Sequence, residues 1–175
     1  MKEILAKLVE GKDLTKEEAM KAQELILTGQ ATEAQIACFL TALRMKGETL
    51  DEITGLAAVL RNKANTISPK VADYVDFVGT GGDCTYSFNI STTSAFVVAA
   101  AGLPVAKHGN RSISSKSGAG DVLEALGVNI SADPAVVEKC VETVGIGFMF
   151  APHFNPAMKY VGMLHSLFHT NFFNN

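Results

Sequence analysis

A glycine-rich segment between an apolar strand and an apolar helix is the part of the sequence with the clearest chemical potential. Residues 76–92 read DFVGTGGDCTYSFNIST, with three glycines within 79–82. Glycine lets a backbone approach a ligand closely, because no Cβ stands in the way. Asn89, Ser91 and Thr92 then precede a helix, whose unpaired N–H groups attract anions. The segment therefore predicts a phosphate or pyrophosphate site.

This segment differs from both common phosphate-binding fingerprints. A P-loop requires Lys and then Ser or Thr after its last glycine, whereas Gly82 is followed by Asp83. The dinucleotide fingerprint GxGxxG requires a third glycine that GTGGDC lacks. We therefore expect a phosphate loop of another kind. The alternative is a strand-to-helix turn that uses glycine only for its backbone geometry.

A second polar segment has the composition of a sugar-phosphate site. Residues 107–121 read KHGNRSISSKSGAGD. Lys107 is a point charge for a phosphate, and Arg111 is a bidentate donor. Asn110 offers a donor and an acceptor, and four serines add hydroxyl groups. Together these groups would surround the 5-phosphate and ribose of a sugar phosphate. The alternative is an ordinary polar surface loop with two cations.

The first 65 residues contain the helix start and stop signals of an all-helical module. Capping boxes pair a threonine side chain with the third helical residue, and they predict where helices begin. Three such pairs occur: Thr15 with Glu18, Thr32 with Gln35, and Thr49 with Glu52. An apolar stripe on the third helix needs a packing partner. We find no cluster of residues with chemical promise in this module.

After a predicted linker at 66–73, short apolar strands alternate with helices. We expect strands at 74–78, 103–107 and 146–150, and helices near 91–101, 118–126 and 134–144. This order predicts a parallel sheet with right-handed crossovers, in which ligands bind beyond the carboxyl ends of the strands. The predicted fold class is α/β: an N-terminal helical bundle module (1–65), the linker (66–73) and an incomplete parallel-sheet α/β domain (74–175) that would bind a sugar phosphate.

Composition excludes some classes of function. The formal net charge is −3, which gives non-specific nucleic-acid binding little electrostatic support. No apolar run approaches the roughly 18 residues of a membrane span. The three cysteines have no metal-ligand or CxxC spacing, so we expect reduced thiols in a cytoplasmic protein. Cys84 lies in the glycine-rich segment, where it is either reactive or merely small.

Three motifs resemble one enzyme family. The sequences GTGGD (79–83), NIST (89–92) and KHGNRSISSKSGAGDVLEALG (107–127) are similar to those of anthranilate phosphoribosyltransferases. The leading helices are similar to the same family, and the match extends to about Val161. The resemblance implies transfer of a phosphoribosyl group from 5-phosphoribosyl-1-pyrophosphate to anthranilate, giving N-(5-phosphoribosyl)anthranilate and pyrophosphate in tryptophan biosynthesis. It also implies a Mg²⁺ cofactor and a homodimer formed through the helical domain, with no nucleic-acid or membrane partner.

The resemblance also implies which residues hold each substrate. Gly79, Asn110 and His165 would contact anthranilate, Ser91 would contact Mg²⁺, and His108 is the only candidate for an acid–base role. The phosphoribosyl donor would be held by Gly79, Gly82, Asp83, Ser87, Asn89, Ile90, Ser91, Thr92, Lys107, His108, Gly109, Asn110, Arg111, Ser112, Ile113, Ser114, Ser115 and Ala119.

The chain departs from the family near its C-terminus. His165 stands where the family has an arginine that pairs with the anthranilate carboxylate, and a later Asp–Glu pair for a second Mg²⁺ is absent. Family members are roughly twice as long, so we expect a truncated or altered product with weak catalysis or none. The Phe-rich tail at 168–173 plugs a gap in the fold, mediates oligomerisation, or is the altered end of a truncated product. The alternative function is a non-catalytic relative that binds a phosphorylated ligand or a protein partner.

Overall fold

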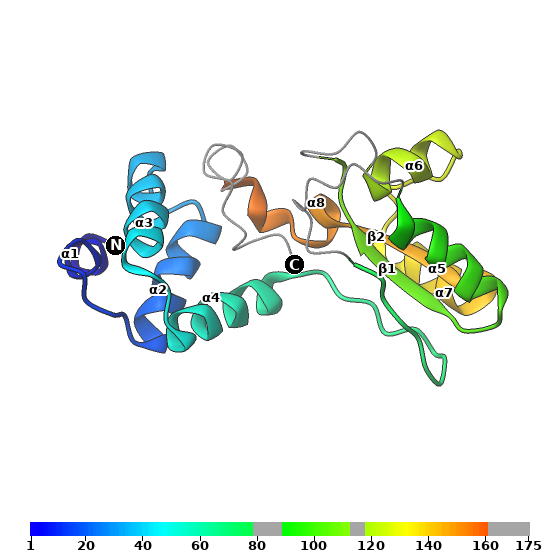
Figure 1. Cartoon of the computed structure of the whole chain (residues 1–175), viewed down its shortest axis with the longest axis horizontal. Helices are drawn as coiled ribbons and strands as arrows, with labels where there is room; N and C mark the ends of the chain where they lie inside the picture. The colour runs from blue at the N-terminus through cyan, green and yellow to red at the C-terminus, as the bar shows by residue number, and fades with distance from the viewer. Residues whose placement is uncertain (79–88, 113–117, 161–175) are drawn as a thin grey trace. The chain divides into compact units, whose positions relative to one another are not determined.

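The computed structural model describes residues 1–78, 89–112 and 118–160. It divides the chain into two compact units, which Figure 1 labels by element. The helical unit comprises Met1–Ala64 and, among the described residues, 157–160. The α/β unit comprises Asn65–Pro156. The predicted fold class, a helical module followed by an incomplete parallel α/β region, is confirmed.

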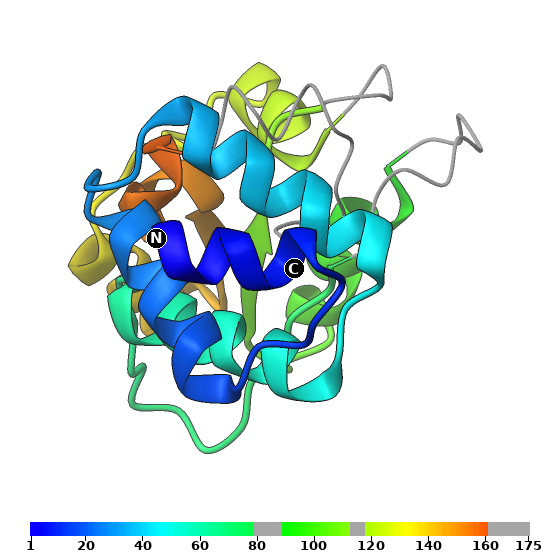
Figure 2. The same ribbon diagram turned by 90° about the vertical axis from the view of Figure 1, so that its left-hand side faces the viewer.

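The helical unit is built from four α-helices and a short 3-10 helix. Their bounds are α1 Lys2–Val9, α2 Lys16–Leu27, α3 Glu33–Lys46, α4 Leu50–Lys63 and η1 Pro156–Tyr160. All three predicted capping boxes are present, with both reciprocal hydrogen bonds formed at the start of α2, α3 and α4. In Figure 2, α1 lies nearest the viewer with α3 beside it.

The core of the helical unit joins all four helices. Ile4, Leu8, Ile26 and Phe39 are among its buried side chains. The backbones of α2 and α4 approach closely at Gly55, because a Cβ on this residue would lie 2.5 Å from the Lys16 carbonyl oxygen. Glycine is therefore required where these helices touch.

The 3-10 helix η1 completes this core, which the sequence did not predict. Ala157 and Met158 pack against the buried cluster, and the ring of Tyr160 lies against Gly29. Cys38 is a half-buried free thiol.

A buried carboxylate links two of the three connections between the four helices, the one from α1 to α2 and the one from α3 to α4. The Glu52 side chain is completely buried; its Oε1 accepts the N–H of Leu14 at 2.9 Å, and its Oε2 accepts the N–H of Thr49 at 2.8 Å. Lys46, with only 7% of its side chain exposed, donates to Glu52 Oε2 at 3.0 Å and to Asp13 at 2.7 Å. Burial favours the neutral acid, but these donors outweigh it and lower the pKa of Glu52.

The α/β unit contains one parallel pair of strands with helices against it. Its elements are α5 Ile90–Ala100, β1 Val105–Gly109, α6 Ala119–Ala125, α7 Pro134–Val144, β2 Ile146–Phe150 and α8 Ala151–Phe154. Strands β1 and β2 pair in register from Val105 with Ile146 to Gly109 with Phe150. Helix α7 packs along β2, and α5 contacts both strands. Asp133 and Pro134 begin α7, as predicted.

The first predicted strand differs from the expectation. Residues 74–78 form a single parallel bridge, from Val75 to Val105, so the described residues contain a two-stranded sheet instead of three strands. The Val75 N–H donates to Pro104 O, and the Val75 carbonyl accepts from Ala106 N. After Val75 the regular backbone ladder stops, because the next backbone N–H of β1, that of His108, donates to the side chain of Asp76. Strand β1 begins at Val105, two residues later than the start predicted for the 103–107 strand.

The predicted linker is tied to α7 by side chains. The backbone N–H groups of Ser68 and Lys70 donate to Glu138 and Glu142, each at 2.7 Å. The domain boundaries predicted from the sequence, at 65 and 74, stay a prediction. Among the described residues, no helix is both long and apolar enough to cross a membrane.

We predict that Glu52→Ala lowers the free energy of unfolding by about 3–5 kcal/mol, because it orphans two buried N–H groups and removes the buried partner of Lys46. Urea denaturation measures this loss. The matched control is Glu10→Ala, which breaks an exposed ion pair with Lys12 and should cost about 0–1 kcal/mol. Equal losses in the two variants would contradict the assignment.

The same network sets the direction of a pH dependence. The pKa of Glu52 is lowered in the folded state, so its stabilisation is present above the unfolded value of about 4.3 and is lost as pH falls through the folded pKa. The difference in stability between wild type and Glu52→Ala should therefore shrink in acid.

Candidate functional site

The strand register defines one carboxyl edge of the sheet. The 74–78 segment, β1 and β2 all run in the same direction. Their carboxyl ends, at residues 78, 109 and 150, therefore lie at the same edge. Helix α5 begins at this edge and packs on β1 and β2. Asn89 is the N-cap of α5 and Lys107 lies in β1, and a ligand site shared by the two stays a prediction.

The N-terminus of α5 has the features of an anion-binding helix end. Asn89 is its N-cap, with Oδ1 accepting the N–H of Thr92 at 3.0 Å. The N–H groups of Ile90 and Ser91 have no acceptor inside the helix, as in any first turn. The Thr92 hydroxyl is buried and has no partner among the described residues. A buried, unpaired hydroxyl beside unpaired amides favours an anionic ligand.

Lys107 is a buried cation on β1. Only 3% of the residue is exposed, and its Nζ donates to the backbone carbonyl of Phe77. Burial lowers the pKa of Lys107, and the negative charge of Asp76 opposes that shift. The ammonium group has three donors, and the described residues offer one hydrogen-bond acceptor. The arrangement leaves donors for a ligand at the sheet edge.

His108 follows Lys107 in β1, and its backbone N–H is bound by a side chain of the 74–78 segment. Its N–H donates to Asp76 Oδ1 at 3.0 Å. Its Nε2 is buried, with no partner in the described part of the chain. Burial lowers the pKa of His108; Lys107 lowers it further, whereas Asp76 raises it. The imidazole is therefore neutral near pH 7, which suits a base or a hydrogen-bond partner better than an acid.

Arg111 differs from its predicted role as a phosphate donor. Its guanidinium forms a bidentate pair with Glu124 of α6, at 2.7 and 3.0 Å, and lies 5.7 Å from the ring centroid of Phe150. Both side chains of the ion pair are about half exposed. Such a pair is weak, so a phosphate could compete for the guanidinium. In this structure, however, two N–H donors of the Arg111 guanidinium are bonded to the Glu124 carboxylate.

Asp121 fixes both ends of the 113–117 segment. Its Oδ2 accepts the N–H of Ser112 at 2.8 Å and that of Gly118 at 2.9 Å. The N–H of Gly120 donates to the Asn110 carbonyl at 3.0 Å. The Asn110 side chain accepts the N–H of Arg111 at 2.8 Å, which leaves its amide NH₂ for a ligand. One carboxylate therefore shapes the second loop.

The predicted site residues divide into two groups. The structure brings Asn89, Ile90, Ser91, Thr92, Lys107, His108, Gly109, Asn110, Arg111, Ser112 and Ala119 to the carboxyl edge. Gly79, Gly82, Asp83, Ser87, Ile113, Ser114, Ser115 and His165 lie outside the described residues. Cys84 and the Phe-rich tail lie there too.

Sequence reasoning missed the carboxylates that position these loops. Asp76, Asp121 and Glu124 contact the loops without having been predicted as site residues. Asp121 could have been found, because a carboxylate three residues after a helix N-cap is half of a capping box. Within the described ranges, no group of three or more His, Cys, Asp or Glu side chains could hold a metal ion.

Comparison with known proteins gives the family. Residues 71–170 match the glycosyl transferase family a/b domain, and residues 2–64 match the helical bundle domain of a glycosyl transferase family. The chain belongs to this glycosyl transferase family. The predicted resemblance to anthranilate phosphoribosyltransferases is also confirmed.

Two enzymes illustrate the sequence similarity. The chain is 59% identical over 160 residues to anthranilate phosphoribosyltransferase from Acetivibrio thermocellus, covering 91% of this chain and 46% of that enzyme. It is 54% identical over 161 residues to the Anaeromyxobacter dehalogenans enzyme, covering 92% of this chain and 48% of that enzyme. The chain spans about half the length of the curated relatives it matches.

Solved structures of this glycosyl transferase family share the fold. Anthranilate phosphoribosyltransferase from Thermus thermophilus matches with a TM-score of 0.87 and 39% identity, covering 98% of this chain and 52% of that one. The Saccharomyces cerevisiae enzyme in complex with PRPP and Mg matches with a TM-score of 0.85 and 27% identity, covering the same shares.

We predict that alanine substitutions at two glycines at the start of α6 differ in their effect on stability. A Cβ on Gly118 would clash with the backbone of Ser112 and lie 2.6 Å from the Arg111 carbonyl carbon, so Gly118→Ala should cost about 1–3 kcal/mol. A Cβ on Gly120 would approach the flexible Arg111 side chain at 3.3 Å, so Gly120→Ala should change stability by less than about 1 kcal/mol. Thermal unfolding compares the two variants, and a tolerated Gly118→Ala would contradict the loop geometry described.

Proposed function

We propose that the protein takes part in transfer of the phosphoribosyl group from 5-phosphoribosyl-1-pyrophosphate to anthranilate, giving N-(5-phosphoribosyl)anthranilate and pyrophosphate. The observation that carries the proposal is the juxtaposition of the α5 N-terminus and the buried Lys107 at one sheet edge. Relatives more than 50% identical are anthranilate phosphoribosyltransferases, which supports the substrate class.

In this proposal the described residues act by binding charge and fixing geometry. The first-turn amides of α5 and the Thr92 hydroxyl would bind the anionic groups of the donor. Lys107 supplies a positive charge in a desolvated position, where electrostatic interactions are stronger than in water. Asn110 would use its amide NH₂ toward anthranilate. Positioning the amine against the anomeric carbon, with the leaving group stabilised, accounts for the catalysis proposed.

Mg²⁺ is the proposed cofactor. One yeast relative was solved in complex with PRPP and Mg. Mg²⁺ in such sites keeps several waters and is bound mainly through substrate phosphates, with few protein ligands. Ser91, in the first turn of α5, is the described residue that would contact it. A single hydroxyl beside an anion site fits this mode, and the ion would neutralise charge on the pyrophosphate.

His108 is the residue we assign, as a proposal, to a proton-transfer or hydrogen-bonding role. Its neutral imidazole and unpaired Nε2 leave it able to accept a proton or a hydrogen bond from a ligand at the edge. A base is not essential for attack by an aryl amine, so a His108→Gln variant separates hydrogen bonding from proton transfer in a pH–rate profile.

The alternative is a relative that binds the donor without turnover. The replacement of the family arginine by His165 predicts weak catalysis, and this stays a prediction because His165 lies outside the described residues. A steady-state assay with both substrates and Mg²⁺, run beside calorimetry with the donor alone, distinguishes the two functions. Binding of the donor without formation of product favours the non-catalytic relative. Turnover at ordinary enzyme rates contradicts it.

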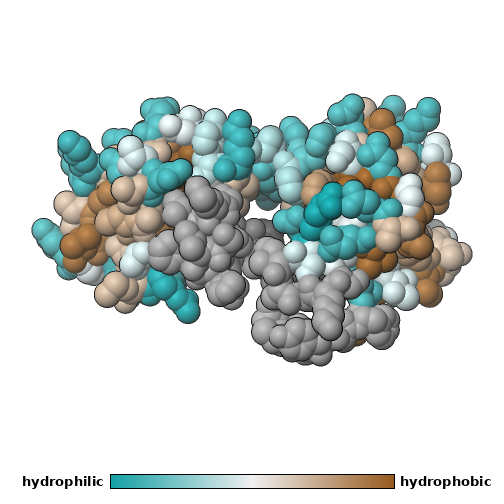
Figure 3. All heavy atoms as spheres, turned by 90° about the horizontal axis from the view of Figure 1, so that it is seen from above, coloured by the Kyte–Doolittle hydropathy of each residue, from teal (hydrophilic) through white to brown (hydrophobic). Residues whose placement is uncertain are grey.

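We also propose a homodimer formed through the helical unit in the cytoplasm. Large apolar side chains are exposed on this unit, including Val9 at 70%, Met45 at 83% and Leu50 at 79%, and Figure 3 shows hydrophobic atoms reaching its surface. Burial of such side chains stabilises association. Sedimentation equilibrium should give a dimer that Met45→Asp weakens; a concentration-independent monomer would remove the proposal.

We predict that Lys107→Met weakens binding of phosphoribosyl pyrophosphate by roughly 10- to 100-fold, because one charge-assisted hydrogen bond is lost while the buried stem is replaced by a side chain of similar size. Calorimetry with Mg²⁺ present measures the change. Lys139→Met, which removes an exposed lysine of α7, is the matched control and should bind as wild type does. Unchanged binding in Lys107→Met would place the donor elsewhere.

A further inference from the structure

Asp76 links the 74–78 segment to strand β1 beside the candidate site. Its carboxylate reaches His108 of β1, with 3.0 Å between Oδ1 and the His108 nitrogen. We propose that Asp76 is a positioning residue of the candidate site, setting both the alignment of the 74–78 segment with β1 and the charge around Lys107. This role rests on the proposed function only for the identity of the ligand.

The hydrogen-bond pattern shows that Asp76 replaces a rung of the sheet. In a regular parallel ladder, Val75 would bond Pro104 and Ala106, as it does, and residue 77 would bond residues 106 and 108. Instead, the Asp76 carboxylate accepts the N–H of His108, and the Phe77 carbonyl accepts from the Lys107 ammonium. The side chain frees the Phe77 carbonyl from the ladder, so that this carbonyl can orient Lys107.

The charge of Asp76 acts on both residues of β1 that face the ligand edge. Burial lowers the pKa of Lys107, and the nearby Asp76 carboxylate is the group that raises it. For His108, burial and Lys107 lower the pKa, and Asp76 again raises it. Among the described residues, these are the charged groups that act on this pair. Without the carboxylate, Lys107 would lose its proton at lower pH.

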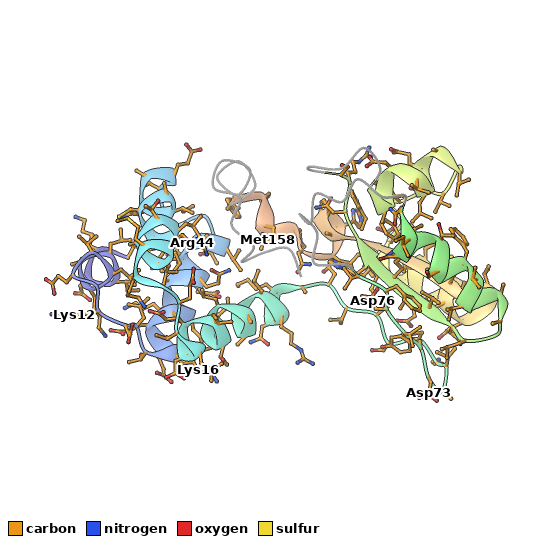
Figure 4. The ribbon with its side chains drawn as sticks, viewed as in Figure 1. Lys12, Lys16, Arg44, Asp73, Asp76 and Met158 are labelled. Carbon is orange, nitrogen blue, oxygen red and sulfur yellow. The ribbon has the colours of Figure 1, made fainter. Side chains whose placement is uncertain are left out.

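Asp73 provides a matched control on the same segment. Figure 4 labels both residues: Asp76 lies beside β1, whereas Asp73 lies along the loop that precedes it. Both are exposed aspartates, three positions apart, and replacing either with asparagine changes the net charge equally. A difference between the two variants therefore reports the position of Asp76 and not the loss of a charge.

The variants Asp76→Asn and Asp76→Ala separate the hydrogen bond from the charge. Asparagine keeps an acceptor oxygen for the His108 N–H but removes the carboxylate charge, so its unfolding free energy should stay within about 0.5 kcal/mol of wild type. Alanine removes both and should cost about 1 kcal/mol. A purely structural role would leave Asp76→Asn like wild type in every measurement.

The direct test is titration of the Lys107 side chain by NMR on the full chain, which needs no ligand. We expect Lys107 to deprotonate at lower pH in Asp76→Asn than in wild type, and Asp73→Asn to leave it unchanged. A Lys107 titration that does not move in Asp76→Asn overturns the proposal. Since the readout is independent of any substrate, it holds whether or not the proposed transferase function is correct.

Calorimetry with phosphoribosyl pyrophosphate and Mg²⁺ then tests the functional consequence. We expect Asp76→Asn to weaken binding roughly tenfold more at about pH 9 than at about pH 7, because more of its Lys107 is neutral at the higher pH. Asp73→Asn should follow wild type. If wild type does not bind the donor, the proposed function fails while the titration still decides the role of Asp76. If it binds and Asp76→Asn follows it at every pH, the positioning role is wrong.

Discussion

The parallel alignment of Val75, β1 and β2 is the constraint on which the candidate site depends. It sends three connecting segments out of the same edge, and it places the start of α5 there as well. A change of one residue in this register would move Lys107 from its buried position to the other face of the sheet. The chemistry of the site is therefore a consequence of strand pairing, with the loops supplying ligand contacts afterwards.

Lys46 of the helical unit and Lys107 of the α/β unit are two largely buried lysine side chains among the described residues, and their charges are paired differently. Lys46 is paired directly with the buried carboxylate of Glu52, whose remaining lone pairs accept backbone N–H groups. Every partner is satisfied, which is the arrangement of a structural ion pair. Lys107 has a carbonyl as its hydrogen-bond partner, and its carboxylate neighbour Asp76 bonds a backbone amide. Within the described part of the chain the pairing of Lys107 is incomplete, which supports its proposed role in binding a ligand.

Sequence signals predicted the local structure well, but they did not predict the side chains that contact and position the candidate site residues. The three capping boxes and the Asp133–Pro134 start of α7 were predictable because each depends on residues within one helical turn. The 74–78 strand was predicted from its apolar content, yet the Asp76 side chain interrupts its ladder. The pairing of Arg111 with Glu124 depends on how α6 packs, which no local pattern reveals.

Both units combine contacts between sequence neighbours with contacts between residues far apart in the chain. The capping boxes join residues three positions apart, whereas Glu52 reaches across 38 positions to Leu14 in the helical unit. In the α/β unit, Asp76 reaches across 32 positions to His108, and Glu138 reaches across 70 to Ser68. Closing long loops costs more chain entropy and slows the search for native contacts. Helices α1 to α4 precede the strands along the chain and emerge from the ribosome before them, whereas η1, which completes the helical core, follows β2. The last part of the helical unit therefore becomes available only after the strands that build the ligand edge.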